Sequence, residues 1–96
     1  MAEVIWQDRA VDDFDNIKHY LRENYGEYQV RRFVRRVFDF LNLLSAYPKL
    51  GPIQNKELEI RGFVISSQTT ILYKTHKSKV FILAFIDNRS DPFLSK

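Results

Sequence analysis

Few side chains in this sequence have the chemistry to move protons or to hold a metal ion. The chain contains two histidines, His19 and His76, and no cysteine. Imidazole titrates in the range that proton transfer requires, but His76 falls in the polar segment 75–79, for which we expect an exposed turn. His19 lies beside the apolar stripe of the first predicted helix, where we expect it to be half-buried. Since no HExxH, CxxC or EF-hand spacing occurs, the sequence predicts no metal site and no cofactor.

Positive charge is the second chemical feature, because 15 Lys and Arg residues outnumber 12 Asp and Glu and give a net charge of +3. This excess permits a polyanionic partner such as RNA, DNA or an acidic protein segment. Two clusters contribute to it, one of Arg31, Arg32, Arg35 and Arg36 and the other of Lys74, Lys77 and Lys79. We interpret the arginines as a solvated helix face, with a basic binding patch as the alternative. The lysines either steer a polyanion or keep a strand edge from aggregating.

Length and composition bound the fold that positions these groups. A chain of 96 residues, 45% of them hydrophobic, has the size and apolar content of one globular domain, 1–96. No apolar run approaches the roughly 18 residues of a membrane span, and the first residues lack the basic start and apolar stretch of a signal peptide. We therefore expect a soluble cytoplasmic protein without membrane contact.

Two amphipathic helices are predicted in the first half of the chain. The first is expected to be capped by Asp8 and to end at Gly26, and the second to cover 27–46 and to end before Pro48. Their apolar faces are formed by Ala10, Phe14, Ile17 and Leu21 in the first helix and by Val30, Phe33, Val34, Val37, Phe38, Leu41 and Leu44 in the second. Because a short turn joins them, they should form a helical hairpin.

Strand-like segments occur at 2–6, 58–64, 69–75 and 80–86, with a loop over 47–56 before the second of them. The last segment is continuously apolar, as expected for a central strand. The order β-α-α-β-β-β predicts an α+β fold. In it, the last three strands form an antiparallel meander, the first strand is added at one side, and the helical hairpin packs on one face of the sheet.

This order of elements, at this length, resembles the RelE/ParE superfamily of toxins from bacterial type II toxin–antitoxin systems. Local motifs carry the resemblance over nearly the whole chain. They are the helix opening 9–17, the Pro-x-x-Gly pattern within 47–51, the pair of segments 60–61 and 70–74, and the segment 87–89 followed by Asp91 and Pro92. The resemblance implies a growth-inhibiting toxin of the plasmid-stabilisation type, neutralised by a cognate antitoxin in a hetero-oligomer.

Two activities are found in this superfamily, cleavage of messenger RNA on the ribosome by RelE-like members and action against DNA gyrase by ParE-like members. The five positions that resemble the nuclease site of RelE-like members hold Arg61, Phe63, Thr70, Arg89 and, as the nearest aromatic of the tail, Phe93. Two of these positions keep a cation, while the residues expected to act as acid and base are replaced. RNA cleavage without a metal ion requires both.

Arg61 and Arg89 are therefore the predicted site residues. One interpretation is a small cationic surface that contacts a phosphate or a protein carboxylate of the target. The other is a structural pair, in which Arg89 holds the tail by bonding Asp87 or Asp91.

Three functions are compatible with these residues. The resemblance and the replaced acid and base favour a ParE-like toxin that binds a protein target such as DNA gyrase. The second is a RelE-like, metal-independent and ribosome-dependent mRNA endoribonuclease with a divergent basic site, which leaves open whether the protein is an enzyme. The third is a binding module without toxicity. An acidic and apolar antitoxin segment is expected to dock in the groove beside the helical hairpin or at an exposed sheet edge.

Overall fold

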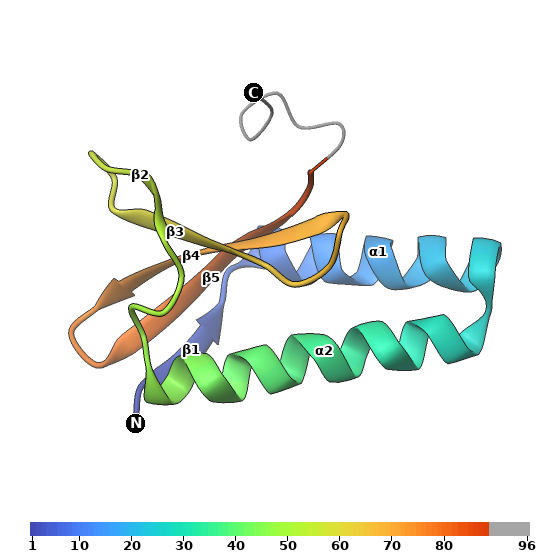
Figure 1. The fold of residues 1–96 in the computed structure, drawn as a ribbon, viewed down its shortest axis with the longest axis horizontal. Helices are drawn as coiled ribbons and strands as arrows, with labels where there is room; N and C mark the ends of the chain where they lie inside the picture. Colours follow the sequence, from blue (N-terminus) through green and yellow to red (C-terminus); the bar gives the residue numbers. More distant parts are fainter. Residues whose placement is uncertain (89–96) are drawn as a thin grey trace.

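The computed structural model describes residues 1–88, which form a sheet with a helical hairpin against one face (Figure 1). The elements are β1 (Glu3–Trp6), α1 (Asp8–Tyr25), α2 (Glu27–Ala46), β2 (Ile53–Asn55), β3 (Ile60–Val64), β4 (Thr69–His76) and β5 (Lys79–Asp87). The α+β fold class expected from the sequence is confirmed. Residues 89–96, which include Arg89 and Phe93, lie outside the described part of the chain.

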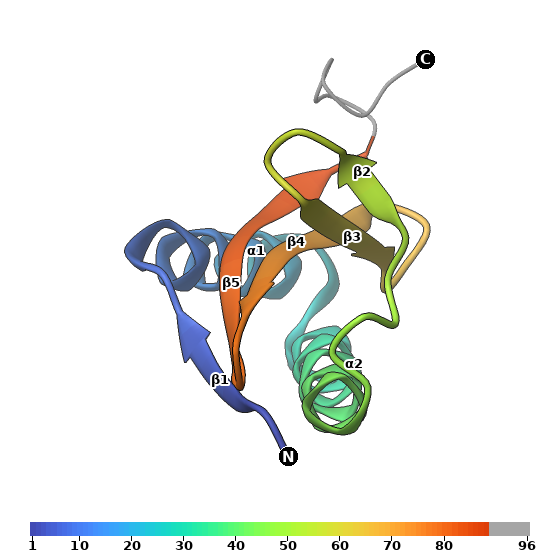
Figure 2. The same ribbon diagram turned by 90° about the vertical axis from the view of Figure 1, so that its left-hand side faces the viewer.

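The strands lie in the spatial order β1-β5-β4-β3-β2. The predicted antiparallel meander is formed by β3, β4 and β5, and β1 lies beside it, parallel to β5, with Glu3 opposite Lys79 and Trp6 opposite Ile82. β5 is therefore paired on both sides, which agrees with the continuous apolar run at 80–86. In the view along the helices, β5 lies in the centre of the sheet, with β1 on one side below α1 and β4, β3 and β2 on the other side above α2 (Figure 2).

One strand was not predicted. β2 pairs with β3 at the far edge of the sheet and falls in the segment 47–56, which was expected to be a loop. Its three residues are too few to show an alternating pattern, and Ile53 is 48% exposed. The next strand was expected from residue 58 but begins at Ile60, because Leu58 and Glu59 lie in a turn where Glu59 has a left-handed φ of 56°.

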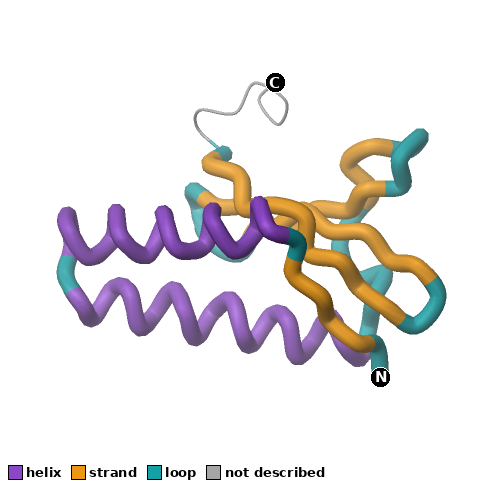
Figure 3. Tube along the Cα trace, turned by 180° about the vertical axis from the view of Figure 1, so that it is seen from behind, coloured by secondary structure: helices purple, strands orange, loops and turns teal. Residues whose placement is uncertain are grey.

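The bounds of the helical hairpin agree with the sequence pattern, but the N-cap does not. α1 begins at Asp8, so Gln7 and not Asp8 is the N-cap, and the Gln7 side chain makes no capping bond. Asp8 instead lies in the first turn, where the helix dipole favours a negative charge. Gly26 ends α1 as predicted, with φ of 95°, and its amide donates to the carbonyls of Leu21 and Arg22. The hairpin projects past the strands at this turn (Figure 3).

Aromatic rings join both helices to the sheet. The ring centroid of Phe14 on α1 lies 5.2 Å from that of Trp6 and 5.6 Å from that of Phe85 on β5. On α2, Phe40 stacks against Phe63 of β3 at 4.4 Å. Full burial of such a side chain stabilises a fold by about 1.5–3 kcal/mol, so these contacts fix the hairpin across the meander.

Three side chains differ from their predicted environments. Phe38 was expected in the core but is 46% exposed, because it packs at the sheet edge, where its ring lies 6.2 Å from that of Trp6 on the short β1. Phe40 was not expected in the core and is 5% exposed. His19 was expected to be half-buried and is exposed. At about 100° per residue it lies on the side of α1 opposite Ala10.

The opposite face of the sheet carries a smaller apolar cluster of Leu72, Ala84 and Ile86, with Ile60 and Leu83 packed against it. Side chains of β4 therefore alternate between two apolar clusters, since Ile71 and Tyr73 belong to the one under the helices. Within residues 1–88, no helix has the length and apolar character needed to cross a membrane.

Candidate functional site

Arg61, one of the two predicted site residues, lies on β3 opposite Tyr73 of β4. Its guanidinium Nη1 donates a 2.7 Å hydrogen bond to the carbonyl of Gly51 and a 3.3 Å bond to the carbonyl of Lys49. The hydroxyl of Tyr73 accepts a 2.8 Å bond from the amide of Gly51. These bonds tie the loop after α2 to the middle of the sheet. We call Gly51, Arg61 and Tyr73 the loop anchor.

Gly51 has no room for a side chain. A Cβ atom at this position would lie 2.8 Å from the carbonyl oxygen of Gly62 and 3.0 Å from the hydroxyl of Tyr73. The loop backbone can approach the sheet this closely only with glycine. The Pro-x-x-Gly pattern at 48–51 therefore has a packing reason in this protein.

Tyr73 is the ionisable phenol of the loop anchor, and its side chain is fully buried. Burial raises the pKa of this phenol above its ordinary value, because the phenolate loses its hydration. The amide of Gly51 and the positive charge of Arg61 oppose this shift without cancelling it. Tyr73 is therefore a neutral hydroxyl at physiological pH, and its Oη acts as an acceptor for the loop.

Phe63 and Thr70, the other described positions that resemble the nuclease site of RelE-like members, carry no positive charge. Phe63 stacks on Phe40 under α2. Thr70 is 3% exposed, and its hydroxyl donates a 2.5 Å bond to Oδ1 of Asn88. His76 is exposed, as predicted, but it is the last residue of β4, opposite Lys79, and does not lie in the turn.

Arg89 itself lies outside the described residues, but the strand register locates Arg61 relative to the end of β5. Arg61 is opposite Tyr73, and Tyr73 is opposite Ile82. Asn88 follows Ile82 by six residues, which corresponds to roughly 20 Å at about 3.3 Å per residue. Asn88, the last described residue before Arg89, therefore does not lie close to Arg61.

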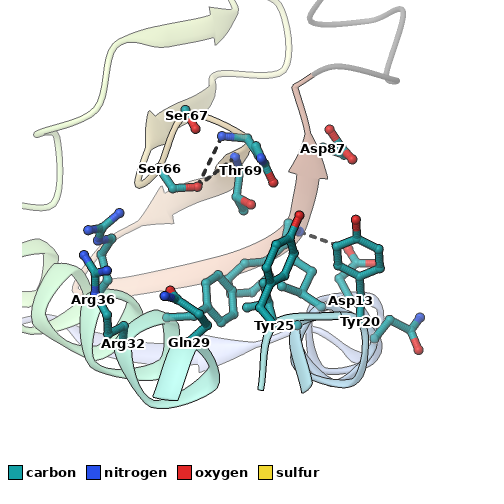
Figure 4. Close-up of a pocket in the computed structure, with 16 residues that line it drawn as sticks. Asp13, Tyr20, Tyr25, Gln29, Arg32, Arg36, Ser66, Ser67, Thr69 and Asp87 are labelled. Carbon is teal, nitrogen blue, oxygen red and sulfur yellow. Dashed lines mark hydrogen bonds between the residues drawn. The ribbon is translucent and has the colours of Figure 1, made fainter. Parts of the chain in front are cut away.

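A different part of the surface is hollowed. A groove of about 700 Å³ opens between the outer part of the helical hairpin and the turn that joins β3 to β4 (Figure 4). We call it the hairpin groove. It is lined by Asp13, Asn16, Ile17, Tyr20, Leu21 and Tyr25 of α1, by Gln29, Arg32, Phe33 and Arg36 of α2, and by Ser66, Ser67, Gln68, Thr69, Phe85 and Asp87.

The two ends of the hairpin groove carry opposite charges. Arg32 and Arg36 lie at one end and Asp13 and Asp87 at the other, with Tyr25 between them (Figure 4). Hydrogen bonds hold both ends in place. Nη1 of Arg36 donates to the carbonyl of Ile65 at 3.3 Å.

Asp13 forms the acidic end and also supports the sheet. Its Oδ2 accepts a 3.0 Å bond from the amide of Phe85 on β5 and a 3.2 Å bond from Nε of Arg9. β1 pairs with β5 only as far as Ile82. The carboxylate thus takes the acceptor position that a longer β1 would have supplied to Phe85.

The sequence analysis expected a groove beside the helical hairpin but did not identify the residues that line it. Arg32 and Arg36 belonged to the predicted arginine cluster, but the pattern did not separate them from Arg31 and Arg35, which do not line the groove. Their spacing of four residues places Arg32 and Arg36 on one side of α2, and this was the signal available. The turn residues 66–68 gave no indication, because their proximity to the helices is a long-range contact.

Comparison with known proteins identifies the family of this chain. The family model described as ParE toxin of type II toxin-antitoxin system, parDE, matches residues 4–92. The chain therefore belongs to the ParE toxin family, and the resemblance to the RelE/ParE superfamily is confirmed. A comparison with curated protein sequences finds no match.

Solved structures show the same fold at low sequence identity. A chain of the chromosomal ParDE TA system from P. aeruginosa has a TM-score of 0.75 at 13% identity, covering 91% of this chain and 96% of that one. The YoeB/ParE toxin from Agrobacterium tumefaciens has a TM-score of 0.63 at 12% identity, covering 88% and 96%. The YoeB-YefM complex from Staphylococcus aureus has 0.60 at 13%, covering 90% and 95%. Both ParDE and YoeB structures thus share this fold.

Proposed function

We propose that this chain is a ParE-like toxin that inhibits growth by binding a protein target, with DNA gyrase as that target, and that it does not cut RNA. The observation that carries the proposal is that Arg61 is hydrogen-bonded within the protein. Its guanidinium is bound to the carbonyls of Lys49 and Gly51, so its hydrogen-bond donors serve the loop anchor. A cation held in this way is a structural element of the sheet.

The requirements of RNA cleavage support the same conclusion. A group must remove the proton of the 2′-hydroxyl, cations must stabilise the phosphorane, and an acid must protonate the 5′-oxygen. Arg61 stays protonated and is a poor base. Its neighbour Phe63 is stacked in the core. His76 lies three residues beyond Tyr73 along β4, roughly 10 Å from Arg61 at about 3.3 Å per residue.

A RelE-like endoribonuclease with a divergent basic site is the second candidate. The likeness to the YoeB-YefM complex of Staphylococcus aureus, with a TM-score of 0.60, favours it. In this alternative Arg61 and Arg89 would act together as the basic site. A non-toxic relative, in which both arginines are structural, is the third.

We further propose a cognate antitoxin as the partner. Two of the similar structures belong by their titles to a ParDE TA system and a YoeB-YefM complex. By analogy, this chain should form a toxin–antitoxin hetero-oligomer in the cytoplasm, in a module of the plasmid-stabilisation type. Apolar burial combined with charge complementarity predicts a dissociation constant of about 1 nM or below.

The test is induced expression of the chain in bacteria without an antitoxin, with growth, messenger RNA integrity and DNA damage followed together. Growth arrest with intact RNA and induced DNA damage is the expected result. Codon-phased RNA cuts that disappear in Arg61→Ala or Arg89→Ala would establish the nuclease instead. Normal growth at a confirmed level of folded protein would support the non-toxic alternative.

A further inference from the structure

β1 is the outermost strand of the sheet and pairs only on the side of β5 (Figure 2). The amide of Glu3 donates a 2.9 Å bond to the carbonyl of Ser78, just before β5. Main-chain groups alternate in direction along a strand, so the N–H and C=O groups of Val4 and Trp6 point away from β5. Within residues 1–88 no strand lies on that side of β1.

This free edge of β1 has defined ends. At its start, the amide of Ala2 donates a 2.9 Å bond to the carbonyl of Ser45, and the Ser45 hydroxyl donates a 2.7 Å bond to the carbonyl of Ala2. The outward groups of Ala2 are therefore already paired with α2. At its other end, the extended backbone stops where α1 begins at Asp8. The edge thus consists of Val4 and Trp6, which fixes the register of any strand that pairs with it.

The two edges of the sheet differ in how they are protected from pairing. β2, at the far edge, has only three residues and a register shift between Ile53 and Asn55, and it lies between Pro52 and Lys56. Bulges, prolines and lysines keep edge strands from pairing with other chains. β1 follows β5 without a register shift and contains neither proline nor lysine. The β1 edge is therefore open to pairing, whereas the β2 edge is not.

Apolar surface lies beside the β1 edge. The side chains of Val4 and Trp6 are partly exposed and pack against the core under the helices. The ring centroid of Phe38 on α2 lies 6.2 Å from that of Trp6, and Phe38 is 46% exposed. Exposed aromatic side chains are enriched in protein interfaces. A strand added at this edge would bury this surface in addition to forming main-chain bonds.

We infer that two copies of this chain associate through β1, in an antiparallel strand pair whose two-fold axis passes beside Ile5. In this register Val4 of one copy lies opposite Trp6 of the other. The two-fold axis generates this pair twice, so every free main-chain group of both edges is bonded. Glu3 lies opposite Gln7, and no like charges face each other. This self-complementarity makes a second copy the occupant that fits the edge.

The association is measured by sedimentation equilibrium of the purified full chain over a concentration series. The mass should rise from the 11.5 kDa of one chain towards twice that value, with a dissociation constant in the micromolar range because the interface is small. Val4→Pro removes an N–H group that faces solvent in the single copy, which an edge strand tolerates. It should weaken association at least about tenfold, with circular dichroism as the check of folding.

A matched pair of substitutions on α2 tests the apolar surface. Phe38 and Leu43 are 46% and 45% exposed, and five residues separate them, so they lie on different sides of the helix. Phe38→Lys places a charge beside Trp6 and should weaken association at least about tenfold. Leu43→Lys should change it less than about twofold, because this side of α2 faces away from β1.

The register is tested by cross-linking, since the chain contains no cysteine. In the inferred pair the Cα atoms of Ile5 from the two copies lie about 4.5 Å apart, within the range of about 4.4–6.8 Å that a disulfide spans. Glu3 lies roughly 13 Å from its equivalent, at about 3.3 Å per residue. Ile5→Cys should therefore form disulfide-linked dimers at least about tenfold faster than Glu3→Cys under diamide, although Glu3 is the more exposed residue.

Several outcomes would overturn the inference. A chain that stays monomeric up to about 1 mM would leave the edge to a strand of a different protein. Association that is unchanged in Val4→Pro, equal losses in Phe38→Lys and Leu43→Lys, or equal cross-linking of Ile5→Cys and Glu3→Cys would also contradict it. Should Val4→Pro fail to fold, the other two pairs of variants still decide. Growth assays are separate, so a non-toxic chain that dimerises through β1 would refute the proposed function alone.

Discussion

The hydroxyl of Tyr73 on β4 accepts a 2.8 Å hydrogen bond from the main-chain amide of Gly51, in the loop that follows α2. Gly51 and Tyr73 are both buried, and 22 residues separate them along the chain. This bond joins the end of the helical hairpin to the centre of the sheet. Arg61 reinforces it from β3 through the carbonyl of the same glycine.

Removal of the Tyr73 hydroxyl should destabilise the fold, although the aromatic ring still fills its place in the core. Tyr73→Phe leaves the buried amide of Gly51 without its acceptor, at an expected cost of about 1–3 kcal/mol. Urea unfolding at neutral pH measures the free energy of unfolding. Tyr47→Phe is the control, since this tyrosine is 62% exposed, and it should change the stability by less than about 0.5 kcal/mol. An unchanged stability in Tyr73→Phe would contradict the role of the bond.

Alkaline pH should destabilise the wild-type chain through the same tyrosine. Because burial raises the pKa of Tyr73 in the folded state, the unfolded chain loses this proton first. The stability contribution is therefore complete below the ordinary tyrosine pKa of about 10 and is lost as the pH rises above it. Unfolding free energies measured across this range should fall more steeply for wild type than for Tyr73→Phe. Parallel curves would show that Tyr73 does not titrate differently on folding.

A methyl group at Gly51 should be costly because its neighbours are backbone and a packed ring. The Cβ of Gly51→Ala would lie 2.8 Å from the carbonyl oxygen of Gly62. Forced overpacking of this kind costs about 1–3 kcal/mol. Lys49→Ala, in the same loop with an exposed side chain, should cost less than about 0.5 kcal/mol in the same thermal or urea unfolding series. Equal effects of the two substitutions would contradict the close approach.

Arg61→Ala should reduce stability by about 1.5–3 kcal/mol, because a charged donor to two loop carbonyls is lost. Toxicity should fall only as far as the amount of folded protein falls. Measuring growth arrest at matched levels of folded protein separates an effect of Arg61→Ala on stability from an effect on toxicity itself. A complete loss of toxicity in a fully folded Arg61→Lys variant would instead place Arg61 in contact with the target.

Asp13 should stabilise the sheet through the amide of Phe85. Asp13→Ala removes the 3.0 Å acceptor, and we expect a loss of about 1–2 kcal/mol. Asp13→Asn keeps an oxygen acceptor and should lose less than half as much. Asp15→Ala is the control, because this carboxylate is 62% exposed and forms a surface pair with Lys18. Hydrogen exchange at the Phe85 amide, faster in Asp13→Ala only, provides a local readout.

Much of the fold was predictable because its signals are local. The apolar periodicity of α1 and α2 and the positive φ of Gly26 depend on residues within a few positions of one another. The same holds for the apolar run of β5. The Pro-x-x-Gly motif was also visible, although its cause, the contact of Gly51 with Gly62 and Tyr73, was not.

Contacts between distant segments decided the rest. β2 forms because a three-residue segment, mostly exposed, pairs with the edge of β3, and Phe40 is buried because Phe63 stacks against it. The sequence singled out Arg61 as a cation of interest, but only the fold shows that its donors meet the loop carbonyls. The hairpin groove joins residues as far apart as Tyr25 and Gln68. Local sequence specifies helices and strands by their periodicity, whereas the partners of a side chain depend on how those elements pack.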